Sequence, residues 1–171
     1  MVTIHLDGEK REVGEGTKLS SVIPGHPEGC SVGIIRPATK EQSATGSLAL
    51  TTTAGEITVE TGGEAGSVFS PDIVGKLALH WSDRYAAAFG PFPSAIRPDR
   101  KPHLYERGDV ILGCGGYDPA RSYIIFSKSR HSADHGADAG GGVIGNVVSG
   151  RAVLDRWASG DHVKKIEPVI S

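Results

Sequence analysis

The sequence predicts a mainly β protein, and three observations support this fold class. The chain of 171 residues contains 24 glycines and 10 prolines, which is many for a helical protein and usual for strands joined by tight turns. Several short segments alternate apolar and polar residues with a period of two, as half-buried strands do. Long helical patterns are missing. The length of 171 residues fits one ordinary domain, or one domain plus a small appendage, and 38% hydrophobic residues are enough for a core.

The first 45 residues predict a small module of the β-grasp, or ubiquitin-like, type. Residues 2–6 alternate apolar and polar side chains, Asp7-Gly8 is a strong hairpin turn, and residues 10–13 supply a second strand. A short helix is expected at residues 17–23 and a third strand at residues 31–35. A module of this size is too small to be stable alone, so we expect it to pack on the rest of the chain.

Residues 46–171 predict a barrel of short strands. A polar linker at residues 38–47 leads into a hairpin over residues 48–60 that turns at Ala54-Gly55. Period-two or buried apolar segments predict further strands at Lys76–Trp81, Tyr85–Phe89, Asp109–Leu112, Ser122–Ser127, Val143–Val148 and Val163–Ile170.

The segments between these strands are rich in glycine or proline. Residues 61–75, 90–107 and 131–142 are therefore expected to be loops, and long ordered loops are often functional. A short helix is expected at residues 151–157, with Gly160 beyond its end. The positions expected to be buried in this helix are Ala152, Val153 and Trp157.

Composition argues against several classes of protein. Lys and Arg total 18 and Asp and Glu total 20, and without a long basic run a nucleic-acid-binding surface is not expected. No stretch approaches the roughly 20 apolar residues that span a membrane. The N-terminus lacks a secretory apolar run, and Cys30 and Cys114 lack metal or redox spacing. We therefore expect a cytoplasmic protein that binds neither nucleic acid nor membranes.

Three segments of the chain together resemble the cyclophilin fold. TTTAGEITVE at residues 51–60 resembles its first hairpin, and SYIIFS at residues 122–127 resembles its buried central strand. Residues 142–171 resemble its closing strand, short helix and final strand, which is the most specific of the three matches. The resemblance implies a cyclophilin-like barrel with short helices over residues 46–171.

The whole chain also resembles the N-terminal part of the methanogenesis marker protein 3 family. The matching stretches are HWSDRYAAAFGPFPS at residues 80–94, GCGGYDP at residues 113–119 and HSADHGA at residues 131–137. The resemblance implies a methanogenic archaeon and a protein partner in the assembly or activation of methyl-coenzyme M reductase. Family members are longer, and the chain ends abruptly at Ile170-Ser171, so we expect a part of a longer protein.

The cyclophilin resemblance raises the possibility of prolyl cis-trans isomerisation. An isomerase needs an apolar proline pocket and a donor near the amide nitrogen, which cyclophilins supply with an Arg and, five residues later, a Phe. Arg84 and Phe89 have this spacing and are the candidate catalytic pair. The rest of the pocket departs from the family, because its Phe, His and Trp fall at Ile125, Gly141 and Gly136. We therefore expect a groove that binds a peptide or protein loop without catalysis.

The expected groove combines aromatic residues at one strand end with positions that the altered pocket leaves open. Aromatic and charged residues packed together are typical of binding surfaces. The alternative is that Trp81 is half-buried in the barrel and Asp83 and Arg84 form only an edge pair. The residues expected to line the groove are His80, Trp81, Tyr85, Phe92, Ile125 and His135.

A dense polar cluster allows a metal site as a third possibility. His131, Asp134, His135 and Asp138 offer imidazole and carboxylate ligands that suit zinc or iron, and Cys114 could add a thiolate. The alternatives are a polar loop bonded to its own backbone and a cysteine that is a small buried hydrophobic residue. We expect no cofactor, and the metal candidates remain Cys114, His131 and His135. An altered isomerase and a metal- or small-ligand-binding barrel thus stay open beside the protein-binding module.

Overall fold

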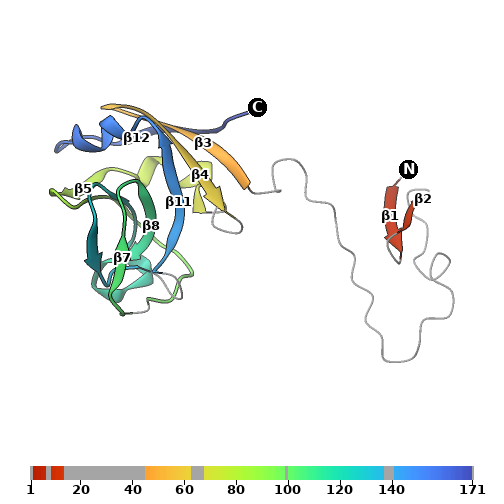
Figure 1. The fold of residues 1–171 in the computed structure, drawn as a ribbon, viewed down its shortest axis with the longest axis horizontal. Helices are drawn as coiled ribbons and strands as arrows, with labels where there is room; N and C mark the ends of the chain where they lie inside the picture. The colour runs from red at the N-terminus through yellow and green to blue at the C-terminus, as the bar shows by residue number, and fades with distance from the viewer. Residues whose placement is uncertain are drawn as a thin grey trace. The chain divides into compact units, whose positions relative to one another are not determined.

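The computed structural model describes the chain in the ranges 2–6, 9–13, 45–62, 68–98, 100–136 and 141–170. The chain divides into two compact units, residues 1–37 and residues 38–171 (Figure 1). Our predicted boundary lies between residues 45 and 46.

In the first unit, the predicted hairpin is present. Strand β1 (Val2–Leu6) pairs antiparallel with β2 (Glu9–Val13), as the Asp7-Gly8 turn leads one to expect. The predicted helix at residues 17–23, the predicted strand at residues 31–35 and Cys30 lie outside the described residues. The β-grasp topology therefore stays a prediction.

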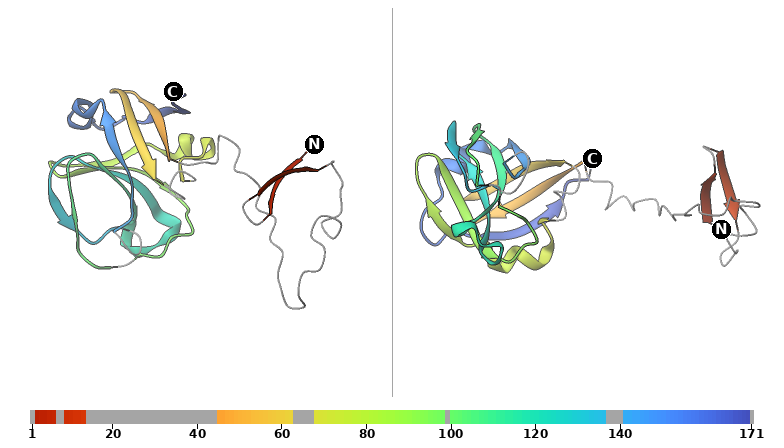
Figure 2. Two further views of the ribbon diagram at one scale, coloured as in Figure 1. Left: turned by 45° about the vertical axis from the view of Figure 1, so that its right-hand side comes forward. Right: turned by 90° about the horizontal axis from the view of Figure 1, so that it is seen from below.

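The second unit is built on one antiparallel sheet of eight strands in the order β12-β3-β4-β11-β8-β9-β6-β5. The strands are β3 (Thr45–Thr52), β4 (Gly55–Gly62), β5 (Leu79–Ser82), β6 (Ala86–Phe92), β8 (Asp109–Cys114), β9 (Ser122–Ser127), β11 (Val143–Ser149) and β12 (Val163–Pro168). The sheet curls into a half-barrel (Figures 1 and 2). Its two edges meet at one point, where Ala78 bridges His162 and the Leu79 amide donates to the Asp161 carbonyl at 2.8 Å.

The inner face of the sheet holds the main hydrophobic core. Because side chains alternate along a strand, Phe89 of β6 and Phe126 of β9 point inward and are almost fully buried. Trp157 packs against both rings, with centroids 4.8 Å from Phe89 and 4.9 Å from Phe126. The Phe89 and Trp157 rings meet edge to face at 75°, which is a favourable aromatic geometry, and the Phe126 and Trp157 rings are tilted at 56°. Trp157 is thus buried as predicted, at the end of the inner core.

A second, smaller core covers the outer face of the same strands. Short strands β7 (His103–Tyr105) and β10 (His131–Ala133) pair with each other, with His131 opposite Tyr105. The outer cluster contains the buried side chains of Ala86, Ala88, Tyr105, Ile111, Tyr123 and Ile125. This explains why every residue of β9 is buried: its two faces are both covered.

Several predicted elements need correction. The loops predicted at residues 90–107 and 131–142 contain β7 and β10, which are three residues each and too short to show a period. The strand predicted from Lys76 begins only at Leu79, because a 3₁₀ helix, η2 (Pro71–Lys76), precedes it. Strand β3 begins at Thr45, inside the predicted linker.

The remaining helices are also short. The helix predicted at residues 151–157 is the 3₁₀ helix η5 (Arg151–Asp155), which buries Val153 and Leu154 and leaves Ala152 exposed. Two single turns, η3 (Gly115–Tyr117) and η4 (Pro119–Arg121), form the predicted GCGGYDP turn. Among the described residues, no helix has the length and apolarity needed to cross a bilayer.

We call residues 131–136, from the start of β10 to Gly136, the outer segment. Gly136 connects this segment to the sheet, and we predict that it does not tolerate a side chain. Gly136 bridges Gly113 of β8, and a Cβ atom on Gly136 would overlap the Gly141 carbonyl and crowd the Tyr105 hydroxyl. Gly136→Ala should lower the free energy of unfolding by about 1–3 kcal/mol, measured by urea denaturation.

The matched control is Gly75→Ala, because no atom lies within 4 Å of a Cβ built there. It should change the free energy of unfolding by less than about 0.5 kcal/mol. Equal effects of the two substitutions would contradict the close contact at Gly136.

Candidate functional site

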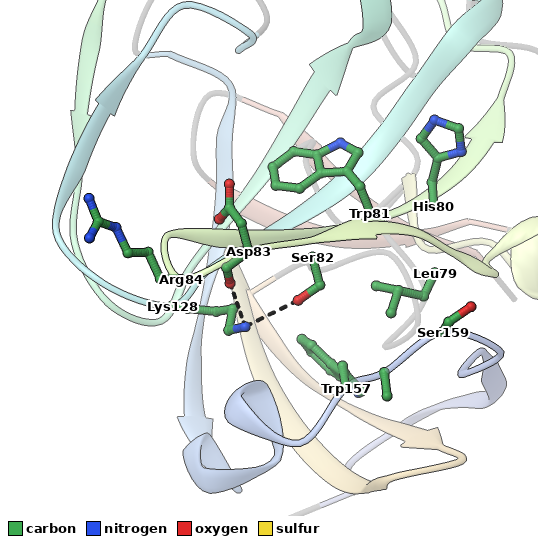
Figure 3. A pocket seen from close by; sticks show the side chains of 10 residues that line it. Leu79, His80, Trp81, Ser82, Asp83, Arg84, Lys128, Trp157 and Ser159 are labelled. Carbon is green, nitrogen blue, oxygen red and sulfur yellow. Dashed lines mark hydrogen bonds between the residues drawn. The ribbon is translucent and has the colours of Figure 1, made fainter.

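Strand β5 lies at an open edge of the sheet. It pairs with β6 on one side, and the bridge between Ala78 and His162 covers only its beginning on the other. A bulge in the pairing falls between Leu79 and Trp81. Figure 3 shows the result, with His80 and Trp81 on one side of the strand and Leu79 and Ser82 on the other.

A pocket of about 500 Å³ lies along this edge. One wall consists of the consecutive residues 79–84, and the opposite wall consists of residues 157–159 (Figure 3). The Leu79 amide bonds to the Asp161 carbonyl, and the Asp161 amide in turn donates to the Ala158 carbonyl at 3.0 Å, so the second wall lies at a chain turn that is tied to the beginning of β5. We call this site the edge pocket.

Lys128 adds a charged group to the edge pocket, beside Asp83 and Arg84 of the first wall. Its ammonium group donates to the Asp83 carbonyl at 2.6 Å and to the Ser82 hydroxyl at 3.1 Å (Figure 3). Its backbone is held as well, since its amide donates to the Tyr85 carbonyl at 2.7 Å and its carbonyl accepts from Arg107 at 2.6 Å. The ammonium group is therefore fixed in position before any ligand binds.

The β5–β6 turn forms the rim of the edge pocket. The Asp83 carboxylate accepts hydrogen bonds from the backbone amides of Tyr85 and Ala86, at 2.7 and 2.9 Å, which fixes the turn. The Arg84 guanidinium lies 4.5 Å from the Tyr85 ring centroid and donates to its hydroxyl. Trp81, which lines the pocket, and Tyr85, which follows the lining residues, each leave 38% of their surface exposed.

The structure separates the residues of the predicted catalytic pair. Arg84 is exposed at the turn, whereas Phe89 is fully buried on the inner face against Trp157. A substrate at the surface cannot contact Phe89 in this arrangement. Arg84 and Phe89 therefore do not form one proline-binding surface.

The predicted groove residues divide into two groups. His80, Trp81 and Tyr85 remain on the surface along the β5–β6 hairpin, and the His80 ring packs 5.0 Å from Tyr123. Phe92 lies in the inner core and Ile125 in the outer cluster, whereas His135 is partly buried and stacks on Tyr105.

Sequence reasoning missed Lys128 and the wall at residues 157–159 as parts of a site. Lys128 comes directly after a strand that is predicted correctly, but nothing local indicates that it reaches the β5–β6 turn. Its position depends on the pairing of β6 with β9, which is a long-range contact. Trp157 is predicted only as a buried residue.

His131 and His135 lie together on the outer face, around Tyr105. The Tyr105 ring centroid is 5.5 Å from each imidazole, and it stacks on His135 at an interplanar angle of 5°. His131 Nδ1 is 2.9 Å from the Ser129 carbonyl, which can only accept, so Nδ1 carries a proton. Both Nε2 atoms are buried and have no hydrogen-bond partner among the described residues.

Cys114 does not join the two histidines. By strand alternation it lies on the inner side of β8, where its sulfur is 3.8 Å from the Ser122 hydroxyl, and burial raises the pKa of its thiol. Asp134 accepts from the Tyr117 hydroxyl at 2.7 Å, and Asp138 lies outside the described residues. Within the described ranges, no three His, Cys, Asp or Glu side chains are grouped as metal ligands.

We predict that His135 makes the fold sensitive to acid. Burial, with a smaller contribution from His131, lowers the pKa of His135 from 6.5 to about 4. The folded state therefore binds fewer protons than the unfolded state, and stability should fall as the pH drops from about 6.5 towards 4, by at most about 1.4 kcal/mol per pH unit. Urea denaturation across this range measures the slope.

His135→Phe keeps a ring against Tyr105 and removes the titrating group. The variant should lose the His135 part of the slope. Identical pH profiles for the variant and the unchanged chain would show that His135 is not responsible.

Comparison with known proteins gives relatives and a fold. No family model matches the chain. It is 31% identical to a UPF0288 protein of Methanosarcina acetivorans, 29% to one of Methanosarcina mazei and 26% to one of Methanothermobacter thermautotrophicus. These matches cover 99%, 99% and 98% of this chain but only 34% of each relative. The chain thus spans about a third of the length of these relatives.

Among solved structures, the chain resembles a cyclophilin-type peptidyl-prolyl cis-trans isomerase of Cryptosporidium parvum. The TM-score is 0.52 with 10% sequence identity, and the match covers 74% of this chain and 98% of that chain. At this identity the likeness concerns the fold alone. The relatives of this chain are therefore UPF0288 proteins of methanogenic archaea, and its sheet resembles the cyclophilin fold.

Proposed function

We propose that the second unit is a non-catalytic protein-binding module that holds an extended segment of a partner protein along β5. The observation that carries this proposal is the edge pocket, whose first wall is formed by six consecutive residues, 79–84. Consecutive lining residues run along the direction of a strand, which suits an extended chain that adds to the sheet edge.

The rim provides side chains that anchor such a segment. Trp81 and Tyr85 are exposed aromatic residues, and aromatic side chains contribute much of the binding energy at protein interfaces. Strand β5 has only four residues and contains a bulge, two features that discourage pairing between copies of an exposed edge. Main-chain pairing at this edge is therefore short, and side chains must supply part of the binding energy.

We further propose that the partner belongs to the assembly or activation machinery of methyl-coenzyme M reductase. Two findings support this proposal: the resemblance to the methanogenesis marker protein 3 family, and relatives from several methanogens. Because the chain spans about a third of these relatives, the proposal concerns one binding module of a larger protein.

The partner proposal predicts a specific capture experiment. The immobilised chain should enrich reductase subunits or their activation proteins from a methanogen lysate, identified by mass spectrometry. Ala158→Trp should reduce this enrichment several-fold, because Ala158 is an exposed residue that lines the edge pocket and an indole there would fill it.

The control is Ala120→Trp, which places the same indole in η4, away from the edge pocket. It should bind like the unchanged chain. Failure to enrich any reductase-related protein would count against the proposed partner.

The proposal also predicts no isomerase activity. The chain should not accelerate cis-trans isomerisation of a short Ala-Pro peptide, which takes tens of seconds uncatalysed at 25 °C, because Arg84 has no Phe89 surface beside it. A rate enhancement that disappears in Arg84→Ala would instead make this protein an enzyme.

A further inference from the structure

We infer that the edge pocket selects a partner segment carrying an acidic side chain, and that Lys128 is the residue that binds its carboxylate. This inference rests on the proposed function. It adds the chemistry of the partner and the residue that determines specificity.

The charge of Lys128 has no direct ionic partner among the described residues. Its ammonium group donates to two neutral oxygens, the Asp83 carbonyl and the Ser82 hydroxyl. An ammonium group has three donors, so one N–H remains for a ligand. A positive charge with a free donor beside a pocket favours an anionic group over a neutral one.

The nearby carboxylates are engaged elsewhere. Asp83 accepts from two backbone amides of its own turn. Asp155 receives two hydrogen bonds from Arg107, at 2.7 and 3.0 Å. Those bonds lower the pKa of Asp155, and the charge of Lys128 contributes less. Neither acid therefore neutralises Lys128 by direct contact.

Lys128 is also held in place, which reduces the entropy lost on binding. Its amide, its carbonyl and its ammonium group all make hydrogen bonds of 2.6 to 3.1 Å within the protein. Leu79 and Trp157 give the pocket apolar surface beside the charge (Figure 3). A Glu or Asp side chain can place its methylene groups there and its carboxylate at Lys128.

Selection from a library of displayed random 12-residue peptides on the 171-residue chain tests this inference. The recovered peptides should share an apolar, strand-forming pattern and should be enriched in Asp or Glu at one fixed position within that pattern. Selection on Lys128→Met should lose that enrichment, and Lys128→Arg should keep it because the charge remains. Lys164→Met, which removes an exposed lysine of β12, is the matched control and should select the same acidic peptides.

A recovered peptide, synthesised with blocked ends, then gives the effect in solution. Replacing its acidic residue by the isosteric Gln or Asn should weaken binding to the unchanged chain about three- to tenfold. The same replacement should have little effect on binding to Lys128→Met. Blocked ends leave side chains as the only carboxylates of the peptide. Any binding of a carboxylate to Lys128 in this experiment therefore involves a side chain and not the chain terminus.

Each outcome decides between the two proposals. If no peptide is enriched on the unchanged chain, the strand-binding proposal fails and this inference fails with it. If peptides are enriched without an acidic preference, or with the same preference on Lys128→Met, the inference alone is overturned. The Gln or Asn comparison on the unchanged chain gives a result even if Lys128→Met proves unstable.

Discussion

The packing of Trp157 against Phe89 and Phe126 is the contact on which both the half-barrel and the edge pocket depend. It seals the end of the inner core and holds residues 157–159 across from β5. Truncation of a buried Trp or Phe of this kind costs about 3–5 kcal/mol. The same rings that stabilise the sheet therefore also set the position of one wall of the pocket.

The central strands of the sheet are packed on both faces, and this arrangement separates structure from binding. The inner face of β6 carries Phe89, and its outer face carries Ala86 and Ala88, whose small side chains fit beneath the outer segment. Little surface remains there for a ligand. Binding is left to the edge, where β5 has four residues and no second neighbour after Ala78 among the described strands.

The sequence predicts those parts of the molecule that depend on local patterns. Segment 122–127 is a strand because its apolar run is continuous, and the Asp7-Gly8 turn predicts a hairpin. Strands β7 and β10 are not predicted because each has only three residues and forms only by pairing with the other, which is distant in the sequence. The role of Lys128 is not predicted either, because long-range strand pairing brings it to the β5–β6 turn.

The single open edge of β5 has a consequence for what can bind. The turn at residues 158–161 uses both the amide and the carbonyl of Ala158, so a bound strand finds its ladder on β5 alone. Parallel and antiparallel ladders place their hydrogen bonds differently. The site therefore has a polarity: a peptide read from its amino end and the same residues in reverse order are different ligands.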